Sequence, residues 1–267
     1  MEKQRGLSGD TAKWALILGG SRGLGLATAQ KLARHGYGLF IVHRDRRTDL
    51  EGIGKSFEAI RASGVPCITF NTDALHAEKR EDILREVRKT LGTVGKIHVL
   101  VHSIAKGHVK PMGGEGPHLS HEDLQLTIGA MAVSLYDWSR RLIDMKLFAG
   151  DTRIISFTSE GSSKALPYYG AVGAAKAALE AISRNMALEF APLGIRVNCI
   201  QAGVTETDSF RMIPGSDKIK AYATKKNPSG RLTSPADVAN AVYLLTLEEA
   251  AWITGTVIKA DGGESLR

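Results

Sequence analysis

The sequence is short of cysteine, of long apolar stretches and of runs of like charge. Its 267 residues include two cysteines, Cys67 and Cys199, which lie far apart in the chain. Two cysteines exclude a disulfide framework and a four-cysteine zinc site, and they are typical of a reducing compartment. No apolar run approaches the roughly 20 residues of a membrane span, and the polar residues 1–13 are unlike a secretory signal. We therefore expect a cytoplasmic protein with no membrane segment.

Charged residues of both signs are mixed along the chain. There are 35 basic and 28 acidic side chains, a net charge of +7, and the basic ones lack the aromatic interleaving of RNA-binding motifs. We expect no nucleic-acid partner. The small cluster of Arg44, Arg46 and Arg47 suits a phosphate-bearing ligand or an acidic partner, or it is only a soluble basic surface.

Short β-rich apolar runs alternate with helix-like segments along the chain. Because the runs are apolar on both faces, the alternation predicts a parallel sheet covered by helices on both sides. With 43% hydrophobic residues, the chain can bury a large core. We predict one α/β domain, residues 1–267, with a doubly wound Rossmann arrangement and a seven-stranded parallel sheet. The predicted strands are 14–18, 38–43, 67–71, 98–102, 153–158, 196–200 and 256–260, and the predicted helices include 24–35, 49–63, 79–91, 123–148 and 171–190.

The segment 206–230 is the least regular part of the chain. It contains Pro214 and Pro228, two glycines and mixed charge. Long insertions outside a sheet are often lids, so we predict a substrate-binding lid with short helices of its own. After it, Ser234 and Pro235 have the pattern of an N-cap and a first helical residue, which predicts a last helix before the final strand.

A glycine-rich turn follows the first predicted strand. Gly19, Gly23 and Gly25 let the backbone turn tightly and approach a pyrophosphate, which the next helix attracts with its free N–H groups and dipole. Strand, turn and helix together are the context that this motif requires; the alternative is a tight turn without a ligand. The residues predicted to bind a dinucleotide are Gly19, Ser21, Arg22, Gly23, Leu24 and Gly25.

The end of the second predicted strand indicates which dinucleotide binds. An acidic residue there hydrogen-bonds the adenosine ribose and repels a 2′-phosphate, but here the first polar residues are His43 and Arg44. Together with Arg22, Arg44 favours the extra phosphate, because guanidinium groups bind phosphate bidentately. Asp45 complicates this assignment, and a solvated basic turn is the alternative. We expect NADPH, with NADH the less favoured cofactor.

The glycine spacing, Gly19-x3-Gly23-x-Gly25, resembles the short-chain dehydrogenase/reductase superfamily. Three later segments resemble it too: Asp73-Ala74, like the adenine-contacting pair, residues 196–198 followed by Ala202-Gly203, and residues 261–263. The likeness covers residues 13–266. It implies an oxidoreductase with a nicotinamide cofactor, and a homo-oligomer, since tetramers are common in the superfamily.

The spacing around the active-site lysine narrows the resemblance. Typical members have Tyr-x3-Lys, but Val172 stands four residues before Lys176, and valine cannot donate a proton. Tyr169 gives a Tyr-x6-Lys spacing instead, which resembles the enoyl-acyl-carrier-protein reductases of bacterial fatty-acid synthesis. The segment His102-Ser103-Ile104-Ala105 resembles the same enzymes, and residues 159–180 resemble their divergent, NADPH-using bacterial type.

Two positions bear on this assignment. The commonest enoyl reductases carry a second tyrosine ten residues before the active one, where this chain has Ser159. A serine there polarises the ketone in ordinary superfamily reductases, so Ser159 is either a second donor or a strand-end hydroxyl. The asparagine of ordinary members is replaced at the aligned position by Ala130, which weakens the case for a ketoreductase.

The resemblance implies a catalytic set of Tyr169, Lys176 and Ser159. Hydride addition to the β-carbon of an enoyl thioester builds negative charge on the thioester oxygen, where a preorganised donor stabilises it. Tyr169 is the expected donor, and Lys176, about two helical turns later, lies on nearly the same face. In the family this lysine holds the nicotinamide ribose. The implied cofactor-binding residues, besides Arg44 and the glycine turn, are Asp73, Ala74, Ser103, Ile104, Ala105, Lys176, Gly203, Thr205 and Thr207.

Several of these polar residues have plainer alternatives. Thr205 and Thr207 are expected at the nicotinamide carboxamide and at a phosphate, or they only cap a loop. His102 is expected to line the cofactor rather than to act as an acid or base. We predict no metal, because the spacing of the histidines with carboxylates fits no metal pattern; these histidines are His108, His118 and His121.

The predicted function is reduction of a trans-2-enoyl thioester by NADPH. The alternatives are a 3-oxoacyl or dienoyl thioester reductase, or a non-catalytic dinucleotide sensor, because a fold alone does not establish chemistry. The substrate is expected on acyl carrier protein or coenzyme A. Acyl carrier proteins are acidic, and basic residues of the predicted lid would steer one; these are Arg211, Lys218, Lys220, Lys225 and Lys226.

Overall fold

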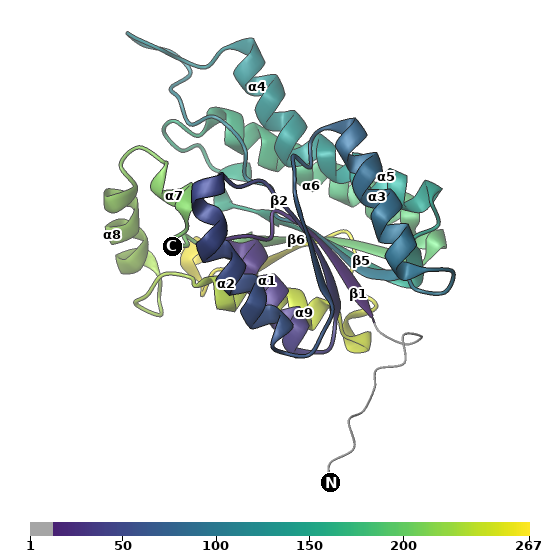
Figure 1. Cartoon of the computed structure of the whole chain (residues 1–267). Helices are drawn as coiled ribbons and strands as arrows, with labels where there is room; N and C mark the ends of the chain where they lie inside the picture. The colour runs from purple at the N-terminus through teal and green to yellow at the C-terminus, as the bar shows by residue number, and fades with distance from the viewer. Residues whose placement is uncertain (1–12) are drawn as a thin grey trace.

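The computed structural model describes residues 13–267, so the expectation about the polar N-terminal residues falls mostly outside the described part. Seven parallel strands form one sheet in the order β3-β2-β1-β4-β5-β6-β7 (Figure 1). This confirms the predicted Rossmann arrangement. The strands are β1 (Trp14–Leu18), β2 (Gly38–His43), β3 (Cys67–Asn71), β4 (Ile97–His102), β5 (Phe148–Thr158), β6 (Ile195–Ala202) and β7 (Val257–Ala260).

Nine α-helices accompany the sheet within residues 13–267. They are α1 (Gly23–Arg34), α2 (Leu50–Arg61), α3 (Ala77–Leu91), α4 (His121–Ile128), α5 (Ser134–Asp144), α6 (Gly170–Phe190), α7 (Asp208–Arg211), α8 (Ser216–Lys226) and α9 (Pro235–Leu245). In this part of the chain, none of the helices has both the length and the apolarity needed to cross a membrane.

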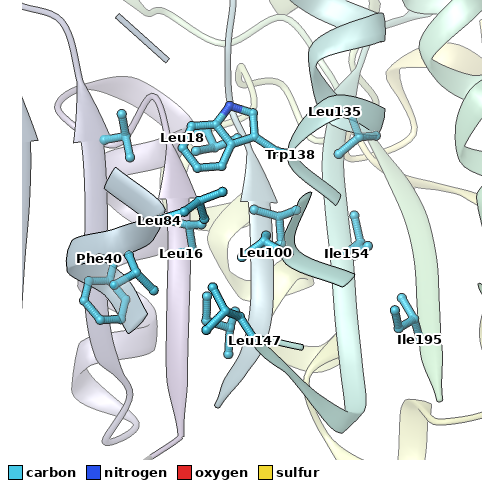
Figure 2. Packing of buried hydrophobic residues seen from close by; sticks show 14 of the residues in the cluster. Leu16, Leu18, Phe40, Leu84, Leu100, Leu135, Trp138, Leu147, Ile154 and Ile195 are labelled. Atoms are coloured by element: carbon cyan, nitrogen blue, oxygen red, sulfur yellow. The ribbon is translucent and has the colours of Figure 1, made fainter. Parts of the chain in front are cut away.

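One face of the sheet is covered by α3, α5 and α6 (Figure 1). Alternate strand residues such as Leu16, Leu100 and Ile154 point into this layer, because successive side chains of a strand lie on opposite faces (Figure 2). Trp138 of α5 is fully buried there, and its indole Nε1 donates to the Ala74 carbonyl oxygen at 2.9 Å. The chain that leaves β4 leads to α5 of this layer, and the chain that leaves β5 leads to α6.

The opposite face is covered by α1, α2 and α9 (Figure 1). The intervening strand residues, such as Ile17 and Ile41, face this second layer. Helix α9 begins as the sequence predicts. Ser234 is the N-cap and forms a reciprocal capping box with Asp237, so two otherwise unpaired backbone N–H groups at this helix end are satisfied.

The predicted helix over 123–148 is wrong as one continuous element. The structure divides it into α4, a π turn (η2, Gly129–Val133) and α5, which ends at Asp144, and Phe148 already belongs to β5. The Ser134 hydroxyl donates to the Ala130 carbonyl oxygen at 2.7 Å and lies 2.7 Å from His102 Nε2, so the π turn brings α5 to the end of β4. Lys146, with φ +54°, turns the chain out of the helix before the apolar residues that continue the helical pattern.

The segment 206–230 lies outside the sheet and contains α7 and α8, as the sequence predicts (Figure 1). The short helical turns of the chain are η1 (Arg47–Asp49), η3 (Glu160–Ser162), η4 (Ala191–Leu193), η5 (Glu248–Ala250) and η6 (Glu264–Leu266).

Candidate active site

The candidate site lies where the strand order changes direction, between β1 and β4. In an open parallel sheet, ligands bind at such a point, beyond the carboxyl ends of the strands. The chain segments that leave β1, β4, β5 and β6 there contain most of the residues predicted from the sequence.

The glycine turn is built so tightly that side chains do not fit. Gly19 has φ +85°, and an added Cβ would lie 2.4 Å from the Ser103 carbonyl oxygen; at Gly25 it would lie 2.1 Å from the Gly19 carbonyl oxygen. The N-cap of α1, Arg22, makes no side-chain hydrogen bond to the helix end. The first N–H groups of α1 therefore keep the arrangement that binds pyrophosphate, and the residues fit a dinucleotide.

The guanidinium groups near the end of β2 are held by carboxylates. Arg22 contacts Asp45, Asp49 and Asp208 at 3.3, 2.7 and 3.2 Å, and Arg44 contacts Asp73 at 2.9 Å. Burial raises the pKa of Asp45, but hydrogen bonds from Ser21 and His43 and the nearby positive charge hold it below its usual value. The side chain of Arg44 is 61% exposed, so it is the guanidinium more accessible to a ligand.

The two residues expected at the adenine, Asp73 and Ala74, have different roles in the structure. Asp73 faces Arg44 and Lys106, and it also accepts a hydrogen bond from the Leu75 N–H. The Ala74 carbonyl oxygen is used inside the core by Trp138. Asp73 is therefore the member of this pair whose side chain lies at the surface of the site.

His102, at the end of β4, is almost fully buried. Its Nε2 lies 2.7 Å from the Ser134 hydroxyl. Burial lowers the pKa of His102 to about 3, so the ring is neutral near pH 7 and is a poor acid or base catalyst. The next residue, Ser103, donates its N–H to the Leu18 carbonyl oxygen at 2.8 Å and thereby joins the end of β4 to the glycine turn.

Tyr169 and Ser159 come together although they are ten residues apart. The Tyr169 Oη and the Ser159 Oγ are 3.3 Å from each other. Burial raises the pKa of Tyr169, with a smaller opposing effect from Ser159, so the phenol stays protonated and can donate. The neighbouring Tyr168 has φ +62° and is 44% exposed. Of the two tyrosines, Tyr169 is the one that lies beside a candidate partner.

Lys176, seven residues after Tyr169, lies in α6 and is 8% exposed. Its Nζ donates to the Phe157 carbonyl oxygen at 2.7 Å. Burial lowers the pKa of Lys176 to about 8, with partial compensation from the nearby Cys199 and Glu180. The lysine is therefore mostly charged at pH 7. Val172, at the Tyr-x3-Lys position, is buried in a cluster with Met131 and Ala175.

The turn after β6 holds the two threonines expected at the cofactor. The Thr205 hydroxyl donates to the Gly203 carbonyl oxygen at 2.9 Å. Thr207 is the N-cap of α7, and its Oγ1 accepts from the Phe210 N–H at 3.2 Å. Both hydroxyls thus have local roles, but Thr207 still has an O–H to donate to a phosphate.

A cavity of about 610 Å³ lies beside Tyr169. Its lining is mostly apolar and comes from the segment after β5, from the start of α6 and from the loop before α4. The lining residues include Pro111, Met112, Gly161, Leu166, Tyr168 and Tyr169. Sequence reasoning missed Met112, because no spacing relates it to the tyrosine; an added Cβ at Gly170 would lie 2.7 Å from its sulfur.

The three loop histidines lie apart from the tyrosine. His108 Nδ1 is 3.2 Å from Asp123, His118 contacts the Gly116 carbonyl oxygen, and His121 is the first residue of α4. Among residues 13–267, the structure places no three His, Cys, Asp or Glu side chains where they would hold a metal ion.

Some basic residues of the 206–230 segment form ion pairs and others do not. Lys220 pairs with Glu206 at 2.6 Å, Arg211 with Asp208 at 2.8 Å, and Lys226 with Glu160 at 3.3 Å. Within the described part of the chain, Lys218 and Lys225 are exposed and make no ion pair. Sequence reasoning assigned no role to Glu160, although a charge directly after Ser159 was a signal for one.

Comparison with known proteins places the chain in a family. Residues 19–265 match the family model described as enoyl-(acyl carrier protein) reductase. The chain belongs to this family. Its members share the short-chain dehydrogenase/reductase fold, so the chain is a reductase of that superfamily with a nicotinamide dinucleotide cofactor.

Relatives in this superfamily include reductases of unsaturated thioesters. A peroxisomal 2,4-dienoyl-CoA reductase of Danio rerio is 30% identical over 253 residues, 93% of this chain and 80% of the relative. A 1-cyclohexenylcarbonyl-CoA reductase of Streptomyces collinus is 28% identical over 96% of this chain and 88% of the relative. The crystal structure of an enoyl-[acyl-carrier-protein] reductase (NADH) from Aquifex aeolicus superposes with a TM-score of 0.83 at 26% identity, over 97% of this chain and 99% of that one.

Proposed function

We propose that this reductase transfers hydride from NADPH to the β-carbon of a trans-2-enoyl thioester carried by acyl carrier protein, in fatty-acid synthesis. The observation that carries the proposal is the 3.3 Å approach of Tyr169 Oη to Ser159 Oγ, with Val172 buried in the core at the position of the ordinary ketone-reducing tyrosine. The names of the thioester-reducing relatives support the same substrate class.

In the proposed reaction the protein stabilises an enolate. The bound nicotinamide supplies the hydride, which forms a C–H bond at the β-carbon while the double-bond electrons move toward the thioester oxygen. The protonated Tyr169 donates a hydrogen bond to that oxygen, where charge develops. Ser159 is placed to donate a second hydrogen bond or to orient the phenol. A proton from solvent then completes the α-carbon.

Lys176 supports the cofactor and the donor. Its charged ammonium group, now on the Phe157 carbonyl oxygen, is proposed to hold the nicotinamide ribose hydroxyls and to favour charge at the thioester oxygen. We assign NADPH because Arg44 is exposed near the end of β2 and Arg22 lies in the adjacent turn. The carboxylates around Arg22 keep NADH as the alternative.

The surroundings of the site fit a carrier-bound acyl chain. The apolar cavity beside Tyr169 is proposed to hold the acyl group. The exposed Lys218 and Lys225 are proposed to meet an acidic carrier protein, or coenzyme A phosphates, and to steer the encounter. We also propose a cytoplasmic homotetramer, to which the exposed apolar side chains Leu188 and Trp252 would contribute contacts.

A second candidate function is reduction of a dienoyl-CoA thioester. The 30% identity with the Danio rerio enzyme favours it among the alternatives. Because the same enolate-stabilising donor would serve both reactions, the donor does not distinguish them, and a substrate assay is needed to separate them. Because of Ser159, the assay also includes a 3-oxoacyl substrate. A dinucleotide sensor would bind the cofactor without turnover.

The test follows NADPH absorbance with crotonyl, 2,4-hexadienoyl and acetoacetyl thioesters, with NADH in parallel. We expect oxidation of NADPH with the crotonyl thioester and none with the ketone. Tyr169→Phe should lower kcat by about a hundredfold, as for loss of one oxyanion donor, while Tyr168→Phe, the adjacent tyrosine, stays near wild type. Activity on the ketone alone would overturn the enoyl assignment, and NADPH binding without turnover on any thioester would favour the sensor.

A further inference from the structure

Lys226, the last residue of α8, is an unusually protected surface lysine. Its side chain is 11% exposed, whereas the preceding residue, Lys225, is exposed. The Lys226 Nζ lies 3.3 Å from both carboxylate oxygens of Glu160. A shielded pair of this kind is screened less by water and salt than an exposed one. It joins the 206–230 segment to a residue 66 positions earlier in the chain.

Glu160 occupies a special position in the site. It directly follows Ser159 and opens the turn η3, while Lys164 contacts it from the cavity side. Burial raises its pKa, but the hydrogen bonds from Lys164 and Lys226 hold the pKa below its usual value, so it stays charged. The next residue, Gly161, lies so close to the Tyr169 ring that an added Cβ would be 2.5 Å from Cε1. Glu160 thus lies in the chain between Ser159, whose hydroxyl contacts Tyr169, and Gly161, which packs against the Tyr169 ring.

A second carboxylate lies near the same lysine. Glu264 is 5% exposed, and both its oxygens accept from the Val204 N–H, at 3.3 and 3.1 Å. Burial raises the pKa of Glu264, and the hydrogen bond from the Val204 N–H and, to a smaller extent, the positive charge of Lys226 oppose that rise. Lys226 thus pairs with Glu160 in the turn after β5, and it lies close enough to Glu264, which holds the turn after β6, to affect the pKa of that carboxyl.

The end of α8 is also the firmest part of the 206–230 segment. The side chain of Asn227 is buried and donates to the Asp261 carbonyl oxygen at 2.9 Å. Earlier in the segment, Met212 is 73% and Tyr222 67% exposed, and the Lys220–Glu206 pair is exposed too. Exposed pairs contribute little to stability, so the shielded contacts of Lys226 and Asn227, together with the buried Ala223, hold this end of the segment.

We propose that Lys226 is a positioning residue for the reaction: through Glu160 it seats the 206–230 segment against the site and fixes the turn that aligns Ser159 with Tyr169. The proposal rests on the proposed function only for the identity of the substrate. Seating of the segment and alignment of the two hydroxyls then occur together. The 206–230 segment acts as a lid, and its closed position determines how the turn η3 aligns Ser159 with Tyr169.

The test compares Lys226→Met with Lys55→Met, which removes a lysine from an exposed ion pair on α2. Lys226→Met should lower kcat on crotonyl thioester by about tenfold, because the donor is displaced from its productive geometry, with the Kd for NADPH unchanged. Lys226→Arg should restore the rate, since it keeps the charge. Glu160→Gln should lower kcat in the same way, and the double variant should be no worse than either single one.

A second readout does not need turnover. Chymotrypsin cleavage after Tyr222 requires local opening of α8, so Lys226→Met should be cut faster than wild type or Lys55→Met. If wild type reduces no enoyl thioester, the proposed function fails while this proteolysis result still judges the lid. Equal kcat and equal cleavage in the two lysine variants would overturn the proposal, as would additive effects of Glu160→Gln and Lys226→Met.

Discussion

The glycine turn and the 206–230 segment touch each other but are held by different forces. An added Cβ at Gly23 would lie 3.2 Å from the Thr207 side chain, and Arg22 pairs with Asp208. The glycine turn is fixed by backbone packed on backbone, with no space for a side chain at Gly19 or Gly25. The 206–230 segment is fixed by a few polar contacts, most of them exposed.

This difference separates the tasks of the two regions. Steric packing leaves one conformation, which suits the binding of a pyrophosphate that is common to every reaction cycle. Ion pairs and single hydrogen bonds allow opening at low free-energy cost, which suits the lid proposed for this segment. A single substitution in the glycine turn should therefore have a large effect on binding. Single substitutions in the 206–230 segment should each have a smaller effect.

The variant expected to disrupt the glycine turn most is Gly25→Ala. The new Cβ would lie 2.1 Å from the Gly19 carbonyl oxygen, so the turn must shift. We expect the Kd for NADPH to rise by about a hundredfold, the equivalent of a severe overpacking cost. Fluorescence titration measures it. The control is Gly52→Ala in α2, where an added Cβ meets nothing within 4 Å; it should bind NADPH normally. Equal affinities in the two variants would contradict the steric argument.

Arg44→Ala tests the exposed guanidinium beside the turn. It should raise the Kd for NADPH by about tenfold, the loss of one charged hydrogen-bonding group, and leave the Kd for NADH unchanged. Arg34→Ala, at the other end of α1, removes the same charge away from the site and should alter neither. If Arg44→Ala raised the Kd for NADPH and the Kd for NADH equally, Arg44 would not support the assignment of NADPH.

The smallest effect is expected from the outer face of the 206–230 segment. Lys218→Glu with Lys225→Glu should raise KM for an acyl-carrier-protein substrate about threefold more than for the coenzyme A ester, through a slower encounter. Lys226 is left intact, because its charge serves Glu160. Steady-state kinetics with both substrates measures the difference. Lys79→Glu with Lys89→Glu on α3 makes the same charge change elsewhere; an equal effect there would refute local docking.

The fold could be predicted because its cause is local. Strands β1, β2 and β3 begin and end at the predicted residues, since apolar runs bounded by turn residues specify buried parallel strands. The error at 123–148 has a tertiary cause. Ser134 reaches His102, 32 residues earlier, and the Ile97 N–H donates to the Leu147 carbonyl oxygen, so distant partners divide an apolar stretch that looks continuous.

The candidate site follows the same rule. Spacing alone favoured Tyr169 over Tyr168, and the structure places only Tyr169 within reach of Ser159. The pairing of Lys226 with Glu160 had no periodicity to reveal it, because ion-pair partners on separate elements share no spacing. The sequence therefore predicted the residues that a motif orders and missed those that only the packing of two segments brings together.

The buried Val172 also constrains how the Tyr-x6-Lys and Tyr-x3-Lys spacings can be related in evolution. Its side chain fills a compact cluster with Met131 and Ala175, next to the π turn. A tyrosine introduced there would have to displace these neighbours before its hydroxyl could reach a substrate. A lineage moving between the two tyrosine registers therefore needs several coupled replacements, with intermediates that lack a well-placed donor, and the Tyr-x6-Lys spacing becomes hard to reverse once this core has closed.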